Sequence, residues 1–146
     1  MQNSKIKIIL ITPSLITGGS QRVMSYIVNN IDKNKFDITL LVLNNKNPIS
    51  KFHDPRIKII DLKIKKVRFS IFKILKISKK IKPNIIFSTQ YHMNLYLIIF
   101  KFLFSSNIKF IARETNVLSL KLTNKIFFNR INNFLIIFFY KYFDKI

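Results

Sequence analysis

Apolar and polar residues follow two different spacings along this chain, which indicates strands alternating with helices. Continuous apolar runs of strand length are typical of strands buried in a sheet, and we predict strands over residues 5–13, 37–45, 56–64, 84–89 and 107–114. Apolar residues at helical spacing lie between or after most of these runs, and they predict helices over residues 20–31, 70–83, 92–104 and 121–143. Residues 144–146 have the pattern of a strand that has barely begun.

Two of these helices indicate which of their faces is buried. In the first, the apolar residues at helical spacing are Val23, Tyr26, Ile27 and Ile31. In the helix over residues 70–83, lysines at 73, 76 and 80 oppose an apolar face that consists of Ile71, Ile74, Leu75 and Ile81. Ser70 is expected to cap the start of this helix, and Pro83 to stop it.

Strands that alternate with helices predict a Rossmann-like α/β fold, with a doubly wound parallel sheet. Parallel neighbours need a crossover connection, and crossover helices cover both faces of such a sheet. Ligands of these folds bind at the carboxyl ends of the strands. The informative segments are therefore residues 17–22, 88–94 and 113–116, which follow the first, fourth and fifth predicted strands.

The first of these segments contains Gly18 and Gly19, which are the only glycines in the chain. Glycine permits positive φ and close approach of a ligand to the backbone, so the pair predicts an unusual backbone at this turn. It serves either a tight turn or an anion or sugar hydroxyl at the start of the helix. The spacing is neither G-x-G-x-x-G nor G-K-[ST], which excludes the dinucleotide fingerprint and the P-loop.

The other two segments contain the candidate catalytic residues. His92 follows the fourth strand, where it is either a site residue or a helix-capping, partly buried histidine. Glu114 is the only glutamate in the chain, and Arg113 and Asn116 flank it. A carboxylate beside a guanidinium can bind substrate hydroxyls or act on a proton; the alternative is a surface ion pair.

Composition limits the class of protein. A chain of 146 residues fits one domain, and the absence of cysteine excludes disulfides and thiolate metal sites. The amino terminus lacks the pattern of a signal peptide, which favours the cytoplasm, and no apolar stretch reaches the ~20 residues that span a bilayer. A net charge of +20 favours an anionic partner, although an AT-rich genome would give the same excess of Lys, Ile, Asn and Phe.

The three segments also carry a resemblance to a known family. "KIILITPSLITGGSQR", "KPNIIFSTQYHMN" and "IKFIARETN", in this order, resemble the amino-terminal half of the family 4 glycosyltransferases, whose GT-B architecture has two facing Rossmann-like domains. The resemblance covers essentially all 146 residues. The family's glycine pair usually precedes Ala-Glu-Arg, and this chain departs from that pattern at Ser20 and Gln21 but keeps Arg22. The "ARETN" segment is similar to the Arg-Glu-Ser-Asn loop of many bacterial members.

This resemblance implies retaining transfer of a sugar from a nucleotide sugar to a cell-surface glycan or lipid-linked acceptor, with no metal required. Residues 1–146 would form the acceptor-side domain, and we expect the chain to be truncated before a donor-binding domain with a paired-glutamate motif. The expected catalytic residues are Glu114 and His92. The expected substrate-binding residues are Gly18, Gly19, Arg22, Arg113 and Asn116.

With this resemblance, the basic strip over residues 56–82 is expected to contact anionic lipid at the inner face of the cytoplasmic membrane. Two other functions stay open at this stage. The chain as a whole is alternatively a non-enzymatic module that binds anionic membrane or nucleic acid, although lysines interleaved with isoleucines and no stacking motif argue against nucleic acid. It is alternatively a small nucleotide-binding protein that lacks the glycine fingerprint.

Overall fold

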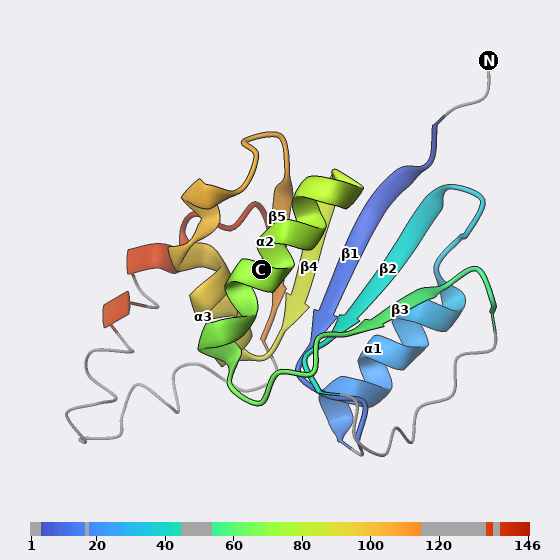
Figure 1. The fold of residues 1–146 in the computed structure, drawn as a ribbon, viewed down its shortest axis with the longest axis horizontal. Coiled ribbons are helices and arrows are strands. Elements are labelled where there is room, and N and C mark those ends of the chain that lie inside the picture. Colours follow the sequence, from blue (N-terminus) through green and yellow to red (C-terminus); the bar gives the residue numbers. More distant parts are fainter. Residues whose placement is uncertain (1–3, 17, 45–53, 115–133, 136–137) are drawn as a thin grey trace.

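The computed structural model describes residues 4–16, 18–44, 54–114, 134–135 and 138–146. Its centre is a five-stranded sheet in which every neighbouring pair of strands is parallel, in the order β3-β2-β1-β4-β5 (Figure 1). The strands are β1 (Ile6–Thr12), β2 (Phe36–Val42), β3 (Lys58–Asp61), β4 (Ile85–Thr89) and β5 (Lys109–Arg113). This sheet confirms the predicted α/β fold class.

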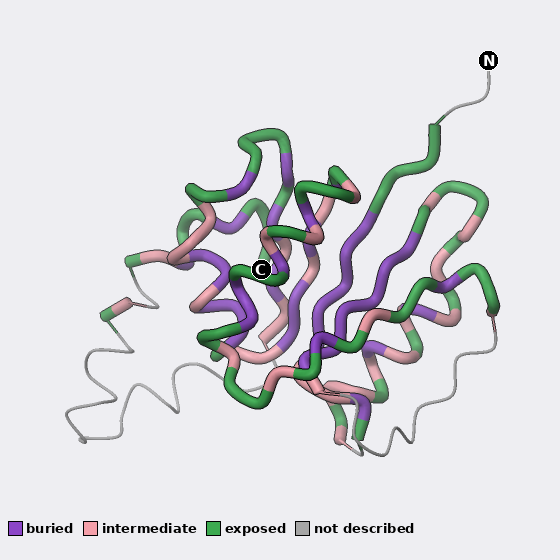
Figure 2. The backbone as a smooth tube through the Cα atoms, in the orientation of Figure 1, coloured by how far each residue is buried: buried purple, intermediate pink, exposed green. Residues whose placement is uncertain are grey.

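Helices cover both faces of the sheet. The helices are α1 (Gly19–Asn30), α2 (Ser70–Ile81) and α3 (Tyr91–Ile99), with short 3-10 turns η1 (Val67–Phe69) and η2 (Lys101–Leu103). Alternate residues of β1 belong to different clusters: Leu10 packs with α1, whereas Ile9 packs with α2 and α3. Successive side chains of a strand point to opposite faces, so the central strands are buried on both sides (Figure 2).

The order of the strands creates one switch point. The chain passes from β1 outward to β2 and β3, then returns to pair β4 with the other side of β1. The segment after β1 leads to α1 on one face, and the segment after β4 leads to α3 on the other (Figure 1). The two connections therefore diverge at the carboxyl ends of β1 and β4, which is where ligands bind in doubly wound sheets.

The buried face of α1 differs from the predicted one. Tyr26 was expected to face the core, but 69% of its surface is exposed, and Val23, Ile27 and Ile31 are only partly buried. The fully buried residues are Met24 and Val28, which lie one turn apart and contact the sheet. Compared with the predicted orientation, α1 is rotated about its axis so that Met24 and Val28 face the sheet and the Tyr26 phenol faces outward.

The helix α2 follows its predicted pattern except at its start. Ile71 and Ile74 are buried, the lysines at 73, 76 and 80 are exposed, and the helix ends just before Pro83. Ser70 was expected to be the N-cap, but Phe69 occupies that position and the Ser70 hydroxyl instead donates to the Val67 carbonyl at 2.6 Å. The reason is that η1 leads directly into α2, so the hydroxyl bonds backward.

Two further elements are shorter than predicted. The strand expected over residues 56–64 is limited to β3, which lies at the sheet edge and pairs only with β2. The helix expected over residues 92–104 divides into α3 and η2. The prediction of a helix over residues 121–143 lies mostly outside the described residues, although residues 134–135 and 138–140 are helical.

The end of the chain, where the sequence predicts the beginning of a strand, forms one isolated bridge with β5. Lys145 forms a parallel bridge with Ile111, and the Ala112 N–H donates to the Lys145 carbonyl at 3.0 Å. The Asp144 carboxylate accepts bonds from the Phe110 N–H at 2.8 Å and from Lys101 Nζ at 3.2 Å. The Phe110 N–H bond is the main cause that lowers the Asp144 pKa. Within the described part of the chain, no helix has the length and apolarity needed to cross a bilayer.

Candidate site at the carboxyl edge of the sheet

The segments that follow β1, β4 and β5 meet at one edge of the sheet. Thr89, the last residue of β4, lies opposite Arg113, the last residue of β5. Gln90 and Glu114 come next in the chain, so their positions are neighbours beyond this edge. The predicted grouping of these segments follows from the parallel register of the strands.

One hydrogen-bond chain crosses the switch point. Gln90 Nε2 donates to Ser20 Oγ at 3.1 Å, and Ser20 Oγ donates to Gln21 Oε1 at 2.8 Å. Gln21 Nε2 in turn donates a long hydrogen bond of 3.5 Å to Ser14 Oγ. Amide and hydroxyl groups from the residue after β4, from the start of α1 and from the segment after β1 thus form a continuous polar network. These donors and acceptors suit the hydroxyl groups of a sugar.

Gln90 has an unusual backbone at this point. Its φ of 73° lies in the left-handed region, which costs energy for a residue other than glycine. The preceding residue, Thr89, is fully buried, and its hydroxyl has no hydrogen-bond partner among the described residues. A strained residue beside an unsatisfied hydroxyl at the switch point is typical of a binding site rather than of a simple connection.

The two glycines do not provide the unusual backbone that the sequence predicts. Gly18 is extended, with φ 172°, a conformation open to any residue, and neither glycine has positive φ. A Cβ on Gly18 would meet only the flexible end of Gln21, and a Cβ on Gly19 would point into open space. The prediction of a glycine-dependent turn is therefore wrong. The first turn of α1 has no side-chain cap and no acid, and open space lies beside Gly19.

A second network connects β4, α3 and β5 through Asn94. This residue is fully buried, and its Oδ1 accepts a bond of 2.7 Å from Ser88 Oγ. Its Nδ2 donates to the Arg113 carbonyl at 3.2 Å and to Glu114 Oε1 at 2.6 Å. The buried amide thereby sets the position of the glutamate relative to two strands.

Glu114 is half-buried and held from a second side by Tyr140. The Tyr140 hydroxyl donates to Oε1 at 2.5 Å. Burial and then this bond raise the Tyr140 pKa far above its usual value, and burial followed by the charge of Glu114 raises the Tyr91 pKa. Both described bonds meet at one oxygen, so the carboxylate is fixed in orientation.

The alternative of a surface ion pair between Arg113 and Glu114 is not what the structure shows. None of the ion pairs among the described residues contains either side chain. Arg113 is half-buried, and one of its terminal nitrogens, NH1, is buried without a partner in the described part of the chain. A buried guanidinium nitrogen without a partner suits an anionic or hydroxyl ligand.

The other predicted site residues lie at the margin of this site or outside the described residues. His92 is exposed in the first turn of α3, and its ring centroid lies 3.5 Å from that of Tyr91. It is neither buried nor the helix cap, a position that Gln90 occupies. Arg22 is exposed on α1. Asn116 lies outside the described residues.

Sequence reasoning missed the residues that position Glu114. Asn94 is a single amide within an apolar helix, which is a signal that the pattern contained. Tyr140 is 26 residues from Glu114 in the chain, and no local pattern indicates their contact. The same holds for Gln90, because its backbone angle is set by the packing around it.

Comparison with solved structures identifies the architecture. The sheet matches the Rossmann-like fold of GT-B glycosyltransferases. Sucrose-phosphate synthase from Thermosynechococcus elongatus superposes with a TM-score of 0.61 and 12% identity, over 84% of this chain and 36% of that one. Phytolacca americana UGT2, solved with UDP-2fluoro-glucose and pterostilbene, gives a TM-score of 0.53 and 10% identity, over 82% and 33%.

The GT-B match covers only part of the solved enzymes. This chain spans about a third of the length of each. No protein-family model and no curated protein sequence matches it. The comparisons therefore show the Rossmann-like fold alone, and membership of family 4 stays a prediction.

Proposed function

We propose that residues 1–146 form the amino-terminal, acceptor-side domain of a retaining glycosyltransferase, which moves a sugar from a nucleotide sugar to a cell-surface glycan or lipid-linked acceptor. The observation that carries the proposal is the coincidence of two features. The sheet matches the Rossmann-like fold of GT-B glycosyltransferases, and the only glutamate of the chain is held at the carboxyl edge, where such sheets bind ligands. No metal is needed in this proposal.

Glu114 and His92 are the proposed catalytic residues. A general acid or base needs a defined orientation toward the proton it moves, and Asn94 and Tyr140 give Glu114 that orientation. His92 is exposed beside the same edge and is proposed to contact the reacting groups directly.

The remaining predicted residues are proposed to bind substrate. Gly18 and Gly19 are proposed to contact a sugar hydroxyl or an anion at the first turn of α1, where open space lies beside Gly19. Arg113 offers a buried guanidinium nitrogen, and we assign Arg22 and Asn116 to the same surface from the resemblance alone. The acceptor would lie between α1 and the segment after β5.

The nucleotide sugar is proposed to bind mainly to a second Rossmann-like domain. The test begins with the DNA that follows the codon for Ile146, read in all three frames for such a domain. We expect residues 1–146 alone to show no sugar transfer, and the chain joined to the encoded domain to transfer sugar from a UDP-sugar to an extracted lipid-linked acceptor. A joined, folded protein without transfer would contradict the proposal, as would transfer by the isolated chain.

Peripheral contact with anionic membrane at the inner face of the cytoplasmic membrane is a second proposed function. The outward face of α2 and η1 exposes Phe72 by 68% and Phe69 by 58%, and the Arg68 guanidinium lies 4.9 Å from the Phe69 ring centroid. Exposed aromatic rings among lysines suit an anionic interface. This surface is also what a non-enzymatic basic module would use.

Vesicle sedimentation tests the membrane contact. We expect the chain to bind vesicles that contain phosphatidylglycerol, and Phe69→Ser with Phe72→Ser to weaken binding about 10-fold through lost apolar burial. Tyr26→Ser is the control, because it removes an equally exposed ring from a helix on the other face of the sheet. Equal loss from both changes, or tighter binding to duplex DNA than to vesicles, would contradict the proposal.

A further inference from the structure

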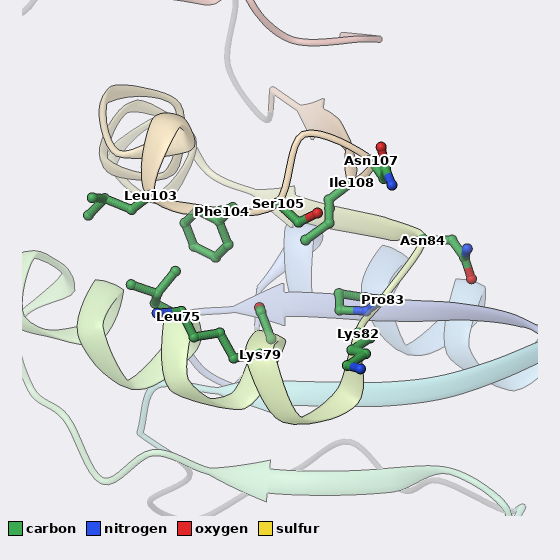
Figure 3. A pocket seen from close by; sticks show the side chains of 11 residues that line it. Leu75, Lys79, Lys82, Pro83, Asn84, Leu103, Phe104, Ser105, Asn107 and Ile108 are labelled. Atoms are coloured by element: carbon green, nitrogen blue, oxygen red, sulfur yellow. The ribbon is translucent and has the colours of Figure 1, made fainter.

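The structure contains a cleft at the edge of the sheet opposite to the candidate site. It lies between the carboxyl-terminal half of α2 and the segment from η2 to the start of β5, and has a volume of about 640 Å³ (Figure 3). Cavities that hold small ligands have volumes of about 300–1,000 Å³. The residues before β4 and β5, Asn84 and Ile108, line it, so it opens at the amino-terminal ends of these strands.

The walls of the cleft are mainly apolar. Leu75 of α2 faces Leu103 and Phe104 across it, with Pro83 and Ile108 at one end (Figure 3). Phe104 and Ile108 are almost fully buried, so the apolar surface is anchored in the core. Such a surface accepts a short alkyl chain.

One buried polar group in this wall has no partner. Ser78 is 3% exposed and lines the cleft, and its hydroxyl forms no hydrogen bond among the described residues. A buried hydroxyl without a partner is unfavourable and indicates a ligand or water that satisfies it. An oxygen of a bound molecule would do so.

The charge around the cleft has one sign. Lys79 and Lys82 line it, and no carboxylate does. Lys82 directly follows α2, and its N–H donates to the Ser78 carbonyl at 2.8 Å. The hydroxyl and an ammonium group therefore come from neighbouring positions, and neither lysine forms an ion pair with a described carboxylate.

We propose that this cleft binds a small anionic amphiphile, free in solution, whose alkyl chain lies against Leu75, Phe104 and Ile108. Its phosphate or carboxylate head lies between Lys79 and Lys82 and accepts a hydrogen bond from Ser78. Binding needs both parts of the ligand, because the lysines and Ser78 contact only its head and the apolar walls contact only its alkyl chain. The site is separate from the carboxyl edge, so it does not depend on the proposed transferase activity.

Octyl phosphate below its micelle concentration is the probe. Titration calorimetry on the 146-residue chain should show one site with a Kd of about 0.1 mM, a value within the range for a ligand of this size. Inorganic phosphate and octan-1-ol, which supply the head and the chain separately, should each bind at least about 10-fold more weakly. Binding of inorganic phosphate as tight as that of octyl phosphate overturns the proposal, as does the absence of saturable binding.

Two lysine pairs on α2 and its C-cap give a matched comparison. Lys79→Ala with Lys82→Ala should weaken binding about 5- to 10-fold, whereas Lys76→Ala with Lys80→Ala should change it less than about 2-fold. Both double variants lose the same charge, and all four side chains are exposed, so folding is expected to persist in each. Equal weakening by the two double variants would mean that octyl phosphate responds only to the overall charge of the chain, and it would overturn the proposal that the cleft is the binding site.

Ser78→Ala separates ligand binding from folding. Removal of a buried hydroxyl that has no partner should leave the melting temperature of the free chain unchanged or raise it. The same change should weaken octyl phosphate binding about 5-fold or more, because it removes a bond to a charged group. Unchanged affinity in a folded Ser78→Ala chain would overturn the assignment of the head group.

Discussion

Asn94 is the residue on which the orientation of Glu114 most depends. Its fully buried amide connects Ser88, the Arg113 carbonyl and the Glu114 carboxylate. Asn94→Leu would leave the Ser88 hydroxyl without its acceptor and the carboxylate without one of its two donors. We expect a loss of about 2–4 kcal/mol in the free energy of unfolding, measured by urea titration.

Asn34→Leu is the matched control for this change, because Asn34 is exposed in a turn. We expect its effect to stay within about 0.5 kcal/mol. A similar loss in both variants would mean that the amide network contributes nothing specific to stability.

Tyr140 gives the site a dependence on pH. Burial and the bond to Glu114 raise its pKa above the ordinary value of 10.0, so above pH 10 the unfolded chain releases this proton while the folded chain keeps it. The stability that Tyr140 contributes is fully present below pH 10 and is lost as the pH rises. Tyr140→Phe should cost about 1–2 kcal/mol at pH 7, and this difference should shrink by about 1.4 kcal/mol by pH 11.

Unfolding of both proteins between pH 7 and pH 11 gives the measurement. The comparison with Tyr140→Phe removes the titration of the many lysines, which the two proteins share. A difference that stays constant with pH would show that the Tyr140 proton is not held more tightly in the folded chain.

The helix α1 shows how the buried face of an element depends on its tertiary partner. Met24→Ala should lower the free energy of unfolding by about 2–4 kcal/mol because it leaves a cavity against the sheet. Tyr26→Ala, two residues along the same helix, should change it by less than about 0.5 kcal/mol because this side chain is largely exposed. A larger loss of stability from Tyr26→Ala than from Met24→Ala in urea unfolding would show that α1 buries the face that the sequence pattern indicates.

The positions of the elements could be predicted from the sequence, whereas their details could not. β1, β2, β4 and β5 follow from continuous apolar runs, because both faces of a parallel sheet are buried. The face of α1 could not be predicted, since Met24 and Tyr26 both fit a helical spacing and only the sheet chooses between them. The shortening of β3 reflects its place at the edge.

The segments that form the candidate site could be predicted from the sequence, whereas the hydrogen-bond network within it could not. Strand order brings Gln90 and Glu114 to one edge, and the sequence already indicated the segments that contain them. The network itself depends on Tyr140 and on the backbone of Gln90, which are set by contacts distant in the chain. The prediction of an unusual backbone at the glycine pair was wrong, because neither glycine has positive φ.

For the whole molecule, the main feature that opposes stability is the excess of positive charge. The chain has 26 lysines and arginines against 6 acids, so repulsion opposes the compact state at low salt. Raising NaCl from 20 to 300 mM should stabilise the chain by about 1 kcal/mol, or roughly 3 °C in melting temperature, by screening this repulsion. A melting temperature that falls with salt would mean that attractive ion pairs dominate.

The central claim is that this chain supplies the acceptor side of a glycosyltransferase, with Glu114 at the reacting centre. The most direct measurement is kcat for sugar transfer by the two-domain protein with Glu114→Gln, which can keep the bonds to Asn94 and Tyr140. Asp37→Asn makes the same chemical change at an exposed position at the opposite end of the sheet. The account predicts a kcat at least about 100-fold lower for Glu114→Gln and unchanged for Asp37→Asn; equal and full activity in both would contradict it.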